Sequence, residues 1–189
     1  LAEKRLLRSE AGRYKSEVPL PDPGLAALWA DVSERLADDA PMLRYLQRCG
    51  ELLTSVLTGS TSPLETLFPN GSFDLAEDLY RRSAAMRYAN AIAASGIEAL
   101  ATAIPAARTL RVLEIGAGTG GTTAVLLPRL PAKRTRYVFT DVSHLFLDQA
   151  RESFSGWGFL EFRLFDLEKD PNEQGIEAAS FDVIVAANA

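Results

Sequence analysis

A glycine-rich stretch between an apolar segment and a helical one constrains the fold of this chain more than any other feature. Residues 110–115 (LRVLEI) form a short β-rich run, four glycines follow within residues 116–121, and residues 122–130 have helical character. Glycine is required where a chain turns sharply and where a ligand approaches the backbone closely. A strand, a glycine loop and a helix in this order predict the first unit of a nucleotide-binding α/β fold.

Strands and helices alternate after this loop. Apolar runs at 136–140, 160–165 and 181–187 are predicted to be strands, and residues 143–154 are predicted to be a helix. Alternation of this kind is typical of a parallel sheet with right-handed crossovers. We therefore expect the fold class α/β, with a Rossmann-like sheet of which the chain holds only the first four strands.

The part of the chain before residue 108 is predicted to be helical. Residues 1–22 are expected to hold an N-terminal helix and a stiff linker, because the three prolines between residues 19 and 23 cannot continue a helix. Residues 23–107 are expected to form a helical lid subdomain, and residues 108–189 the N-terminal half of a cofactor-binding core. Apolar spacing and capping residues predict the helices of the subdomain at 25–37, at 41–59, from 63, from 74 and at 84–104.

Charge and residue usage argue against several function classes. The chain has 189 residues, with 20 Lys and Arg against 25 Asp and Glu, and this net charge of −5 argues against a generic nucleic-acid binder. One cysteine and one histidine exclude a Cys/His zinc cluster. No apolar stretch approaches the length of a membrane span, and the first residues lack a signal-peptide core. We expect a cytoplasmic piece of a longer protein, with no metal, nucleic-acid or membrane partner.

The residue before the glycines distinguishes two kinds of cofactor. Gly116, Gly118 and Gly121 also fit the pattern G-x-G-x-x-G of nicotinamide and flavin binders, so the loop alone is ambiguous. Those cofactors place a pyrophosphate at the helix start, where the carboxylate of Glu114 would repel it. S-adenosylmethionine carries an ammonium and a sulfonium instead, which a carboxylate attracts. The charge of Glu114 therefore favours the methyl donor.

Further polar residues end the other predicted strands. Asp141 lies 21 residues beyond Gly120, and its carboxylate is expected to accept both hydroxyls of a ribose, with capping of the next helix as the alternative. Asp166 either accepts from an adenine amino group or is a turn residue, and Asn188 either shapes the donor pocket or starts a turn. His144 is interpreted as a surface residue at a helix start rather than a general base. The expected cofactor-binding residues are Glu114, Gly116, Ala117, Gly118, Gly120, Asp141, Val142, Asp166, Leu167 and Asn188.

Five segments in the last two thirds of the chain carry a family resemblance. They are 67–74 (LFPNGSFD), 88–90 (YAN), 110–123 (LRVLEIGAGTGGTT), 137–143 (YVFTDVS) and 181–188 (FDVIVAAN). Together they resemble the C-methyltransferase domain embedded in polyketide synthases, a class I S-adenosylmethionine-dependent methyltransferase. The glycine loop is shared by many methyltransferases, whereas its combination with the other segments is much more specific. Residues 1–60 have only a loose likeness to the helical lid of the family.

The resemblance implies a substrate and partners. It implies methylation of the α-carbon of a β-ketoacyl thioester on an acyl carrier protein, next to other synthase domains. The base of the family is a histidine just after the fourth strand, supported by a glutamate on the next strand. Neither matches a position here, so the catalytic residues are expected beyond Ala189. The sheet is expected to continue there too, because residues 181–187 read as a buried strand that needs a neighbour.

Three other hypotheses stay open at this point. A stand-alone methyltransferase for a small oxygen or nitrogen nucleophile would share the glycine loop. A non-catalytic spacer domain of a synthase would be expected to have lost that loop, yet the loop is complete. A nicotinamide-binding reductase is disfavoured by Glu114.

Overall fold

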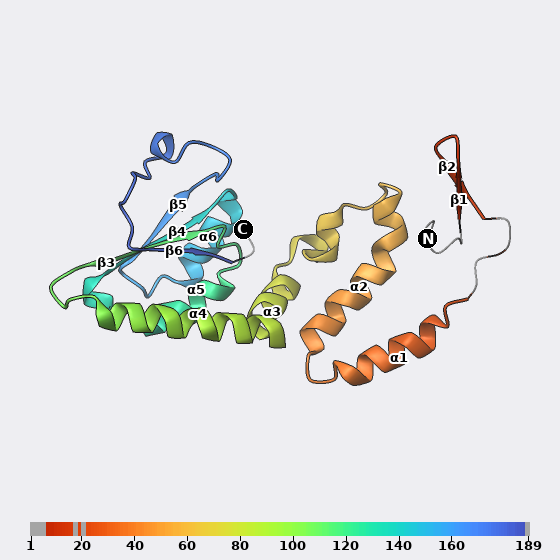
Figure 1. Cartoon of the computed structure of the whole chain (residues 1–189), viewed down its shortest axis with the longest axis horizontal. Coiled ribbons are helices and arrows are strands. Elements are labelled where there is room, and N and C mark those ends of the chain that lie inside the picture. Colours follow the sequence, from red (N-terminus) through yellow and green to blue (C-terminus); the bar gives the residue numbers. More distant parts are fainter. Residues whose placement is uncertain (1–6, 17–18, 20–21, 188–189) are drawn as a thin grey trace. The chain divides into compact units, whose positions relative to one another are not determined.

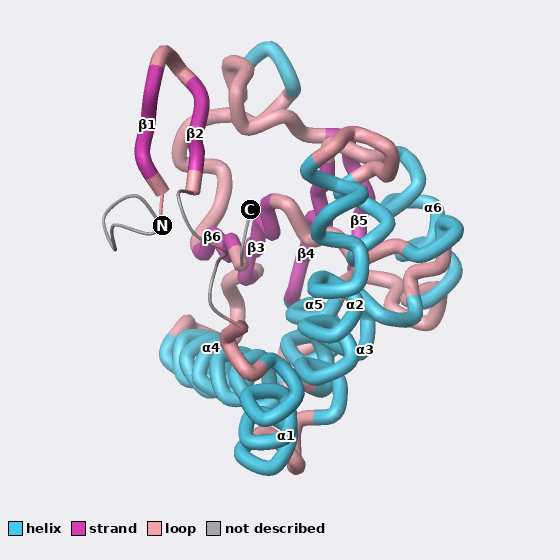
Figure 2. Tube along the Cα trace, turned by 90° about the vertical axis from the view of Figure 1, so that its right-hand side faces the viewer, coloured by secondary structure: helices cyan, strands magenta, loops and turns pink. Residues whose placement is uncertain are grey.

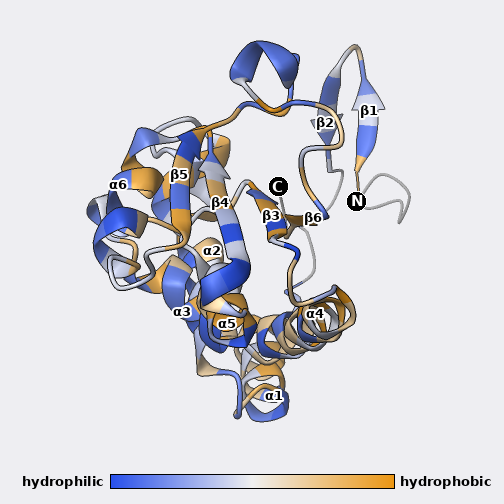
Figure 3. Ribbon diagram, turned by 90° about the vertical axis from the view of Figure 1, so that its left-hand side faces the viewer, coloured by the Kyte–Doolittle hydropathy of each residue, from blue (hydrophilic) through white to orange (hydrophobic). Residues whose placement is uncertain are grey.

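The computed structural model describes residues 7–16, 19 and 22–187, which belong to two compact units, Leu1–Ala37 and Asp38–Ala189. The smaller unit contains a hairpin and one helix (Figure 1). Its elements are β1 (Arg8–Glu10), β2 (Arg13–Lys15), which pairs antiparallel with β1, and α1 (Leu25–Arg35). The residues of both strands are exposed, and Figure 3 shows the hairpin as mostly hydrophilic.

The hairpin corrects one sequence prediction. The N-terminal helix expected within residues 1–22 is wrong where this stretch is described, because Ala11 and Gly12 take φ values of 50° and 77°. Two adjacent residues with positive φ form the tight turn of a two-residue hairpin, and a right-handed helix excludes that conformation. The rest of the prediction, including part of the proline linker, falls on residues 1–6, 17–18 and 20–21, which lie outside the described residues.

In the larger unit, helices precede the sheet. The carboxylate of Asp39 accepts hydrogen bonds from the N–H of Met42 (3.4 Å) and from the N–H of Ala84 (2.8 Å). One side chain thus holds the N-terminal ends of two helices together. The second of these helices, α4 (Ala84–Ala103), begins beside the end of α3 (Asp74–Arg82), which packs against α4 and against α2 (Ala40–Leu57). The elements are α2 (Ala40–Leu57), η1 (Pro63–Thr66), η2 (Pro69–Gly71), α3 (Asp74–Arg82) and α4 (Ala84–Ala103), where η marks a 3₁₀ turn.

The sheet has four parallel strands in the order β5-β4-β3-β6, as the alternation predicts. The strands are β3 (Leu110–Ile115), β4 (Thr135–Asp141), β5 (Leu160–Leu164) and β6 (Val183–Ala186). The connecting elements are α5 (Gly121–Leu126), η3 (Leu127–Arg129), η4 (Ala132–Arg134), α6 (His144–Ser153) and η5 (Asn172–Gln174). Figure 2 shows the helices α4, α5 and α6 apart from the strands, so the larger unit is layered.

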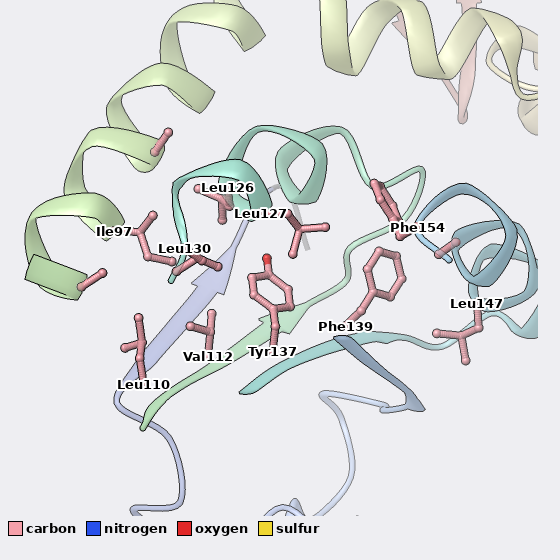
Figure 4. Packing of buried hydrophobic residues seen from close by; sticks show 13 residues of the cluster. Ile97, Leu110, Val112, Leu126, Leu127, Leu130, Tyr137, Phe139, Leu147 and Phe154 are labelled. Carbon is pink, nitrogen blue, oxygen red and sulfur yellow. The ribbon is translucent and has the colours of Figure 1, made fainter. Parts of the chain in front are cut away.

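The main core lies between one face of the sheet and the helices α4, α5 and α6. Side chains of β3 and β4 that point to this face alternate with those of the opposite face, because successive residues of a strand point to opposite sides. Figure 4 shows Ile97 of α4 and Leu147 of α6 at either end of this cluster. The buried members are Ala94, Ile97, Ala101, Leu110, Val112, Leu126, Leu127, Leu130, Tyr137, Phe139, Leu147, Ala150 and Phe154. A smaller cluster of Leu113, Val138, Phe165 and Ile176 lies on the other face.

Candidate functional site

A cavity of about 590 Å³ lies at the carboxyl ends of β3 and β4, the edge at which parallel sheets bind ligands. One wall is the glycine loop after β3, and a second is the end of β4 with the start of α6. A third wall comes from the segment that follows η1, from α3 and from the first half of α4. The lining residues are Leu67, Phe68, Tyr80, Met86, Ala89, Asn90, Ile115, Gly116, Ala117, Gly118, Thr119, Gly121, Thr122, Asp141, Val142, Phe146, Phe165, Leu167 and Ala187.

The glycine loop takes its shape from positive φ angles and from bonds to β4. Gly118 and Gly120 have φ values of 54° and 71°, a region that side chains disfavour. A Cβ at Gly120 would lie 2.6 Å from the ring of Phe154, so this glycine is needed for packing as well, although it does not line the cavity. The N–H of Ala117 donates to the carbonyl of Thr140 at 2.9 Å, which ties the loop to the neighbouring strand.

Asp141 lies where the sequence predicts, at the end of β4 and on the cavity wall. Its side chain is buried with 5% exposure. One carboxylate oxygen accepts from the N–H of Gly118 at 2.9 Å, and the other accepts from the N–H of Ser143 at 2.8 Å. The carboxylate therefore joins the glycine loop to the start of α6. Each oxygen keeps a lone pair for a further donor, so holding the loop is compatible with binding a ligand.

Glu114 does not line the cavity. It is 1% exposed, and one of its carboxylate oxygens accepts hydrogen bonds from the hydroxyl of Thr123 (2.5 Å) and from the hydroxyl of Tyr137 (2.7 Å). Burial raises the pKa of Glu114 to about 7, and the two hydrogen bonds oppose that rise. Burial also raises the pKa of Tyr137 well above its usual value, so the phenol stays a donor.

The position of Glu114 changes the electrostatic argument made from the sequence. Its carboxyl group lies under α5 on the face of the sheet that carries the main core, and both contacts that the structure gives it are neutral hydroxyl groups. Its influence on the cavity therefore passes through Thr123 and α5 rather than through contact with a cationic ligand. The geometry of this residue does not by itself separate a sulfonium cofactor from a dinucleotide.

Two further predicted residues follow β5. Leu167 is 61% exposed and lines the cavity. Asp166 is not among the lining residues: its carboxylate accepts from the N–H of Glu168 at 3.0 Å and pairs with Lys169 at 3.0 Å. The hydrogen bond from Lys169 holds the pKa of Asp166 below its usual value. These contacts correspond to the turn alternative, and a contact with adenine stays a prediction.

The remaining predicted residues divide as follows. The backbone or side chains of Gly116, Ala117, Gly118 and Val142 line the cavity. Asn188 lies outside the described residues, next to Ala187, the last lining residue. His144 is the exposed first residue of α6 and does not line the cavity, in agreement with its interpretation as a surface residue.

The helical part of the larger unit supplies lining residues that were not among the expected cofactor-binding residues, although Phe68 and Asn90 lie in segments that carry the family resemblance. Phe68 and Phe146 pack with ring centroids 5.9 Å apart, and Phe73 contacts both rings at 5.3 Å. Asn90 of α4 is a buried polar residue on the wall, with 5% exposure. The resemblance marked the segments that hold Phe68 and Asn90, but it did not predict their place on the cavity wall, since the residues they meet lie far away in the sequence.

Two absences hold within the described part of the chain. No group of three or more His, Cys, Asp or Glu residues there is arranged to hold a metal ion. Among the same residues, no helix is long and apolar enough to span a bilayer.

Sequence comparison finds polyketide synthases among the proteins that this chain resembles. Residues 113–189 match the family described as methyltransferase domain. The chain is 41% identical over 147 residues to the reducing polyketide synthase BOA6 of Botryotinia fuckeliana, covering 77% of this chain and 6% of that protein. It is 33% identical over 178 residues to the polyketide synthase PksR of Bacillus subtilis, covering 87% of this chain and 7% of that protein. The match is thus to a small part of each relative.

Structural comparison places the chain beside solved methyltransferases. The carbon methyltransferase of CurJ is matched with a TM-score of 0.85 and 36% identity, over 99% of this chain and 50% of that one. The trans-methyltransferase CalH, in complex with SAH, is matched with a TM-score of 0.68 and 33% identity, over 87% of this chain and 45% of that one. The chain therefore spans about half the length of these solved structures. Residues 113–189 match the methyltransferase domain family, and the chain has the class I methyltransferase fold of the CurJ carbon methyltransferase.

Proposed function

We propose that the chain is the cofactor-binding half of a carbon methyltransferase that takes its methyl group from S-adenosylmethionine. The observation that carries the proposal is the cavity at the carboxyl edge of the sheet, which is walled by the glycine loop and by Asp141. The similarity to a methyltransferase solved with SAH, at 33% identity, supports the same cofactor.

The residues of the cavity fit this cofactor in size and chemistry. A volume of about 590 Å³ lies within the range of small-molecule sites. Asp141 offers carboxylate oxygens for the two ribose hydroxyls, next to the exposed side chains of Val142 (66%) and Leu167 (61%), which can flank a planar base. Gly118 lines the cavity without a side chain, so a ligand can approach the backbone closely.

In this proposal the chain orients the reaction and excludes water. The bound cofactor supplies a methyl group that a carbon nucleophile attacks in line. Asp141 and the glycine loop fix the cofactor, and orientation of the two reactants supplies much of the acceleration. Met86, Phe68 and Tyr80 form the wall made by the helical residues, which keeps solvent from the reacting centre. The base that removes the proton of the acceptor is expected beyond Ala189.

The acceptor that we propose is the α-carbon of a β-ketoacyl thioester on an acyl carrier protein. The polyketide synthases among the relatives support it, because they build chains of this chemistry. The proton between two carbonyl groups is acidic enough for a modest base to remove it, and such a base contributes about 10²–10⁴-fold. Neighbouring synthase domains are the expected partners, and a cytoplasmic location is expected for the whole protein.

Substitution of Asp141 tests the cofactor in the intact polypeptide that contains this chain. We expect Asp141→Ala to weaken S-adenosylmethionine binding about 5- to 100-fold, because charge-assisted hydrogen bonds to the ribose are lost. The measurement is isothermal titration calorimetry. Asp148→Ala is the control, since Asp148 is an exposed residue of α6 whose carboxylate pairs with Arg151. An intact protein that binds NADPH and ignores S-adenosylmethionine would refute the proposal.

A further inference from the structure

Asn90 joins three elements around the cavity through one carboxamide group. It lies in α4, it is 5% exposed, and it lines the cavity. Its Nδ2 donates to the carbonyl oxygen of Tyr80 in α3 at 3.3 Å, and its Oδ1 accepts from the hydroxyl of Thr122 in α5 at 2.9 Å. The donor and the acceptor of a single side chain are thus used on two different elements, both of which also line the cavity.

The backbones of α3 and α5 lie close together at the point where Asn90 bridges them. Tyr80 is in the last turn of α3, where carbonyl groups lack an intrahelical partner and must find another donor. Gly121 opens α5 directly beneath it: a Cβ at Gly121 would lie 3.0 Å from the carbonyl oxygen of Tyr80. The backbones of α3 and α5 therefore meet without an intervening side chain, and Asn90 bridges them from the side.

We propose that Asn90 is a positioning residue for methyl-donor binding, an inference that rests on the proposed function. The donor and acceptor ends of a carboxamide are not interchangeable, so the two hydrogen bonds fix the orientation of α4 relative to the glycine loop and to α3. A buried amide without its partners is unfavourable, which disfavours other arrangements. Asn90 thus fixes the position of the cavity wall that contains Tyr80 and Met86 relative to the loop that contains Gly118.

A double-mutant cycle in the intact polypeptide tests this role, with S-adenosylhomocysteine as the probe. The variants are Asn90→Ala, Thr122→Val and the combination of both, measured by calorimetry. Each single variant is expected to raise the dissociation constant about threefold to tenfold, the effect of losing one hydrogen bond in a network. The double variant is expected to bind no more weakly than Asn90→Ala, because Thr122 acts through Asn90.

Three further variants and readouts separate positioning from a general structural role. Thr122→Ser keeps the hydroxyl and is expected to bind as the wild type does. The comparison of Thr122→Ser with Thr122→Val tests the hydrogen bond to Asn90 even if Asn90→Ala does not fold. Thr102→Val is the matched control, because the hydroxyl of this exposed α4 residue bonds only to Glu98 of the same helix among the described contacts. In methylation assays we expect a raised KM for S-adenosylmethionine in Thr122→Val with little change in kcat.

The outcomes distinguish this inference from the function on which it rests. Wild-type affinity in folded Asn90→Ala and Thr122→Val proteins would overturn the role of Asn90 and leave the proposed function intact. Full additivity in the double variant would also overturn it, since Thr122 would then act on the probe directly. A wild-type protein that fails to bind the probe would refute the proposed function and this inference with it.

Discussion

At the scale of single residues, Glu114 places a carboxyl group inside the core. A carboxyl group that is 1% exposed is held by the hydroxyl groups of Thr123 and Tyr137, without a cation among its described contacts. Desolvation of the charged form dominates, which is why its pKa rises to about 7. Both hydroxyl groups donate to the same oxygen, so a neutral amide could accept them equally well.

Glu114 is expected to make the stability of the protein depend on pH. Between pH 4.5 and about 7 the unfolded chain releases this proton while the folded protein keeps it, so the contribution of Glu114 falls as pH rises and levels off above pH 7. The size of the fall is about 3 kcal/mol. Urea unfolding of the intact polypeptide from pH 4.5 to 8 measures it, and Glu114→Gln is expected to remove it.

The matched control for this titration is Glu173→Gln, which changes an exposed glutamate in η5. It should reproduce the wild-type pH profile. Parallel profiles for Glu114→Gln and the wild type would contradict the raised pKa of Glu114.

At the scale of elements, α5 depends on its contact with α3. Gly121 leaves little room for a Cβ, which would lie 3.0 Å from the backbone oxygen and 3.2 Å from the Cβ of Tyr80. Gly96 in the middle of α4 is the opposite case, because nothing lies within 4 Å of a Cβ added there. The two glycines therefore differ in the reason for their presence: one is needed for packing and the other lowers the stability of a helix.

We expect opposite effects when alanine replaces these two glycines. Gly121→Ala should destabilise the protein by about 1–3 kcal/mol, because α3 and α5 must move apart. Gly96→Ala should stabilise it by about 0.5–1 kcal/mol, because glycine is a poor helix former. Denaturant unfolding measures both changes, and a neutral Gly121→Ala would mean that the two helices are less closely packed than described.

At the scale of the whole molecule, the site belongs to one of the two units. Every residue that lines the cavity lies between Leu67 and Ala187, within the unit Asp38–Ala189. The cavity lies in this unit alone because it is formed by the edge of the sheet and by the helices that pack on the sheet.

Deletion of residues 1–37 from the intact polypeptide is therefore expected to leave cofactor binding almost unchanged. The dissociation constant of S-adenosylhomocysteine should stay within about twofold of the wild-type value, a difference well below 1 kcal/mol. Calorimetry on the deleted and the complete protein makes the comparison. A loss of affinity of about tenfold or more would show that the smaller unit contributes to the site.

Much of the fold follows from local sequence, for physical reasons. The alternation of apolar runs and helical stretches predicts the parallel sheet, and the glycines predict the loop, because both depend on backbone geometry over a few residues. The spacing to Asp141 predicts its place on the cavity wall, since the first unit of such a sheet has a nearly constant length. Ala11-Gly12 carried a signal for the hairpin that helix periodicity alone overlooked.

Only the tertiary structure decided which side chains meet at the site. Glu114 shares its strand face with Val112, so its carboxylate lies in the core and not in the cavity, a consequence of the two-residue period of β3. Asn90 reaches the wall because α4 packs on α5, and Phe68 reaches it because its ring packs against Phe146 of α6. Local propensity determines which elements form, whereas burial of their apolar faces against one another determines which polar groups are brought together.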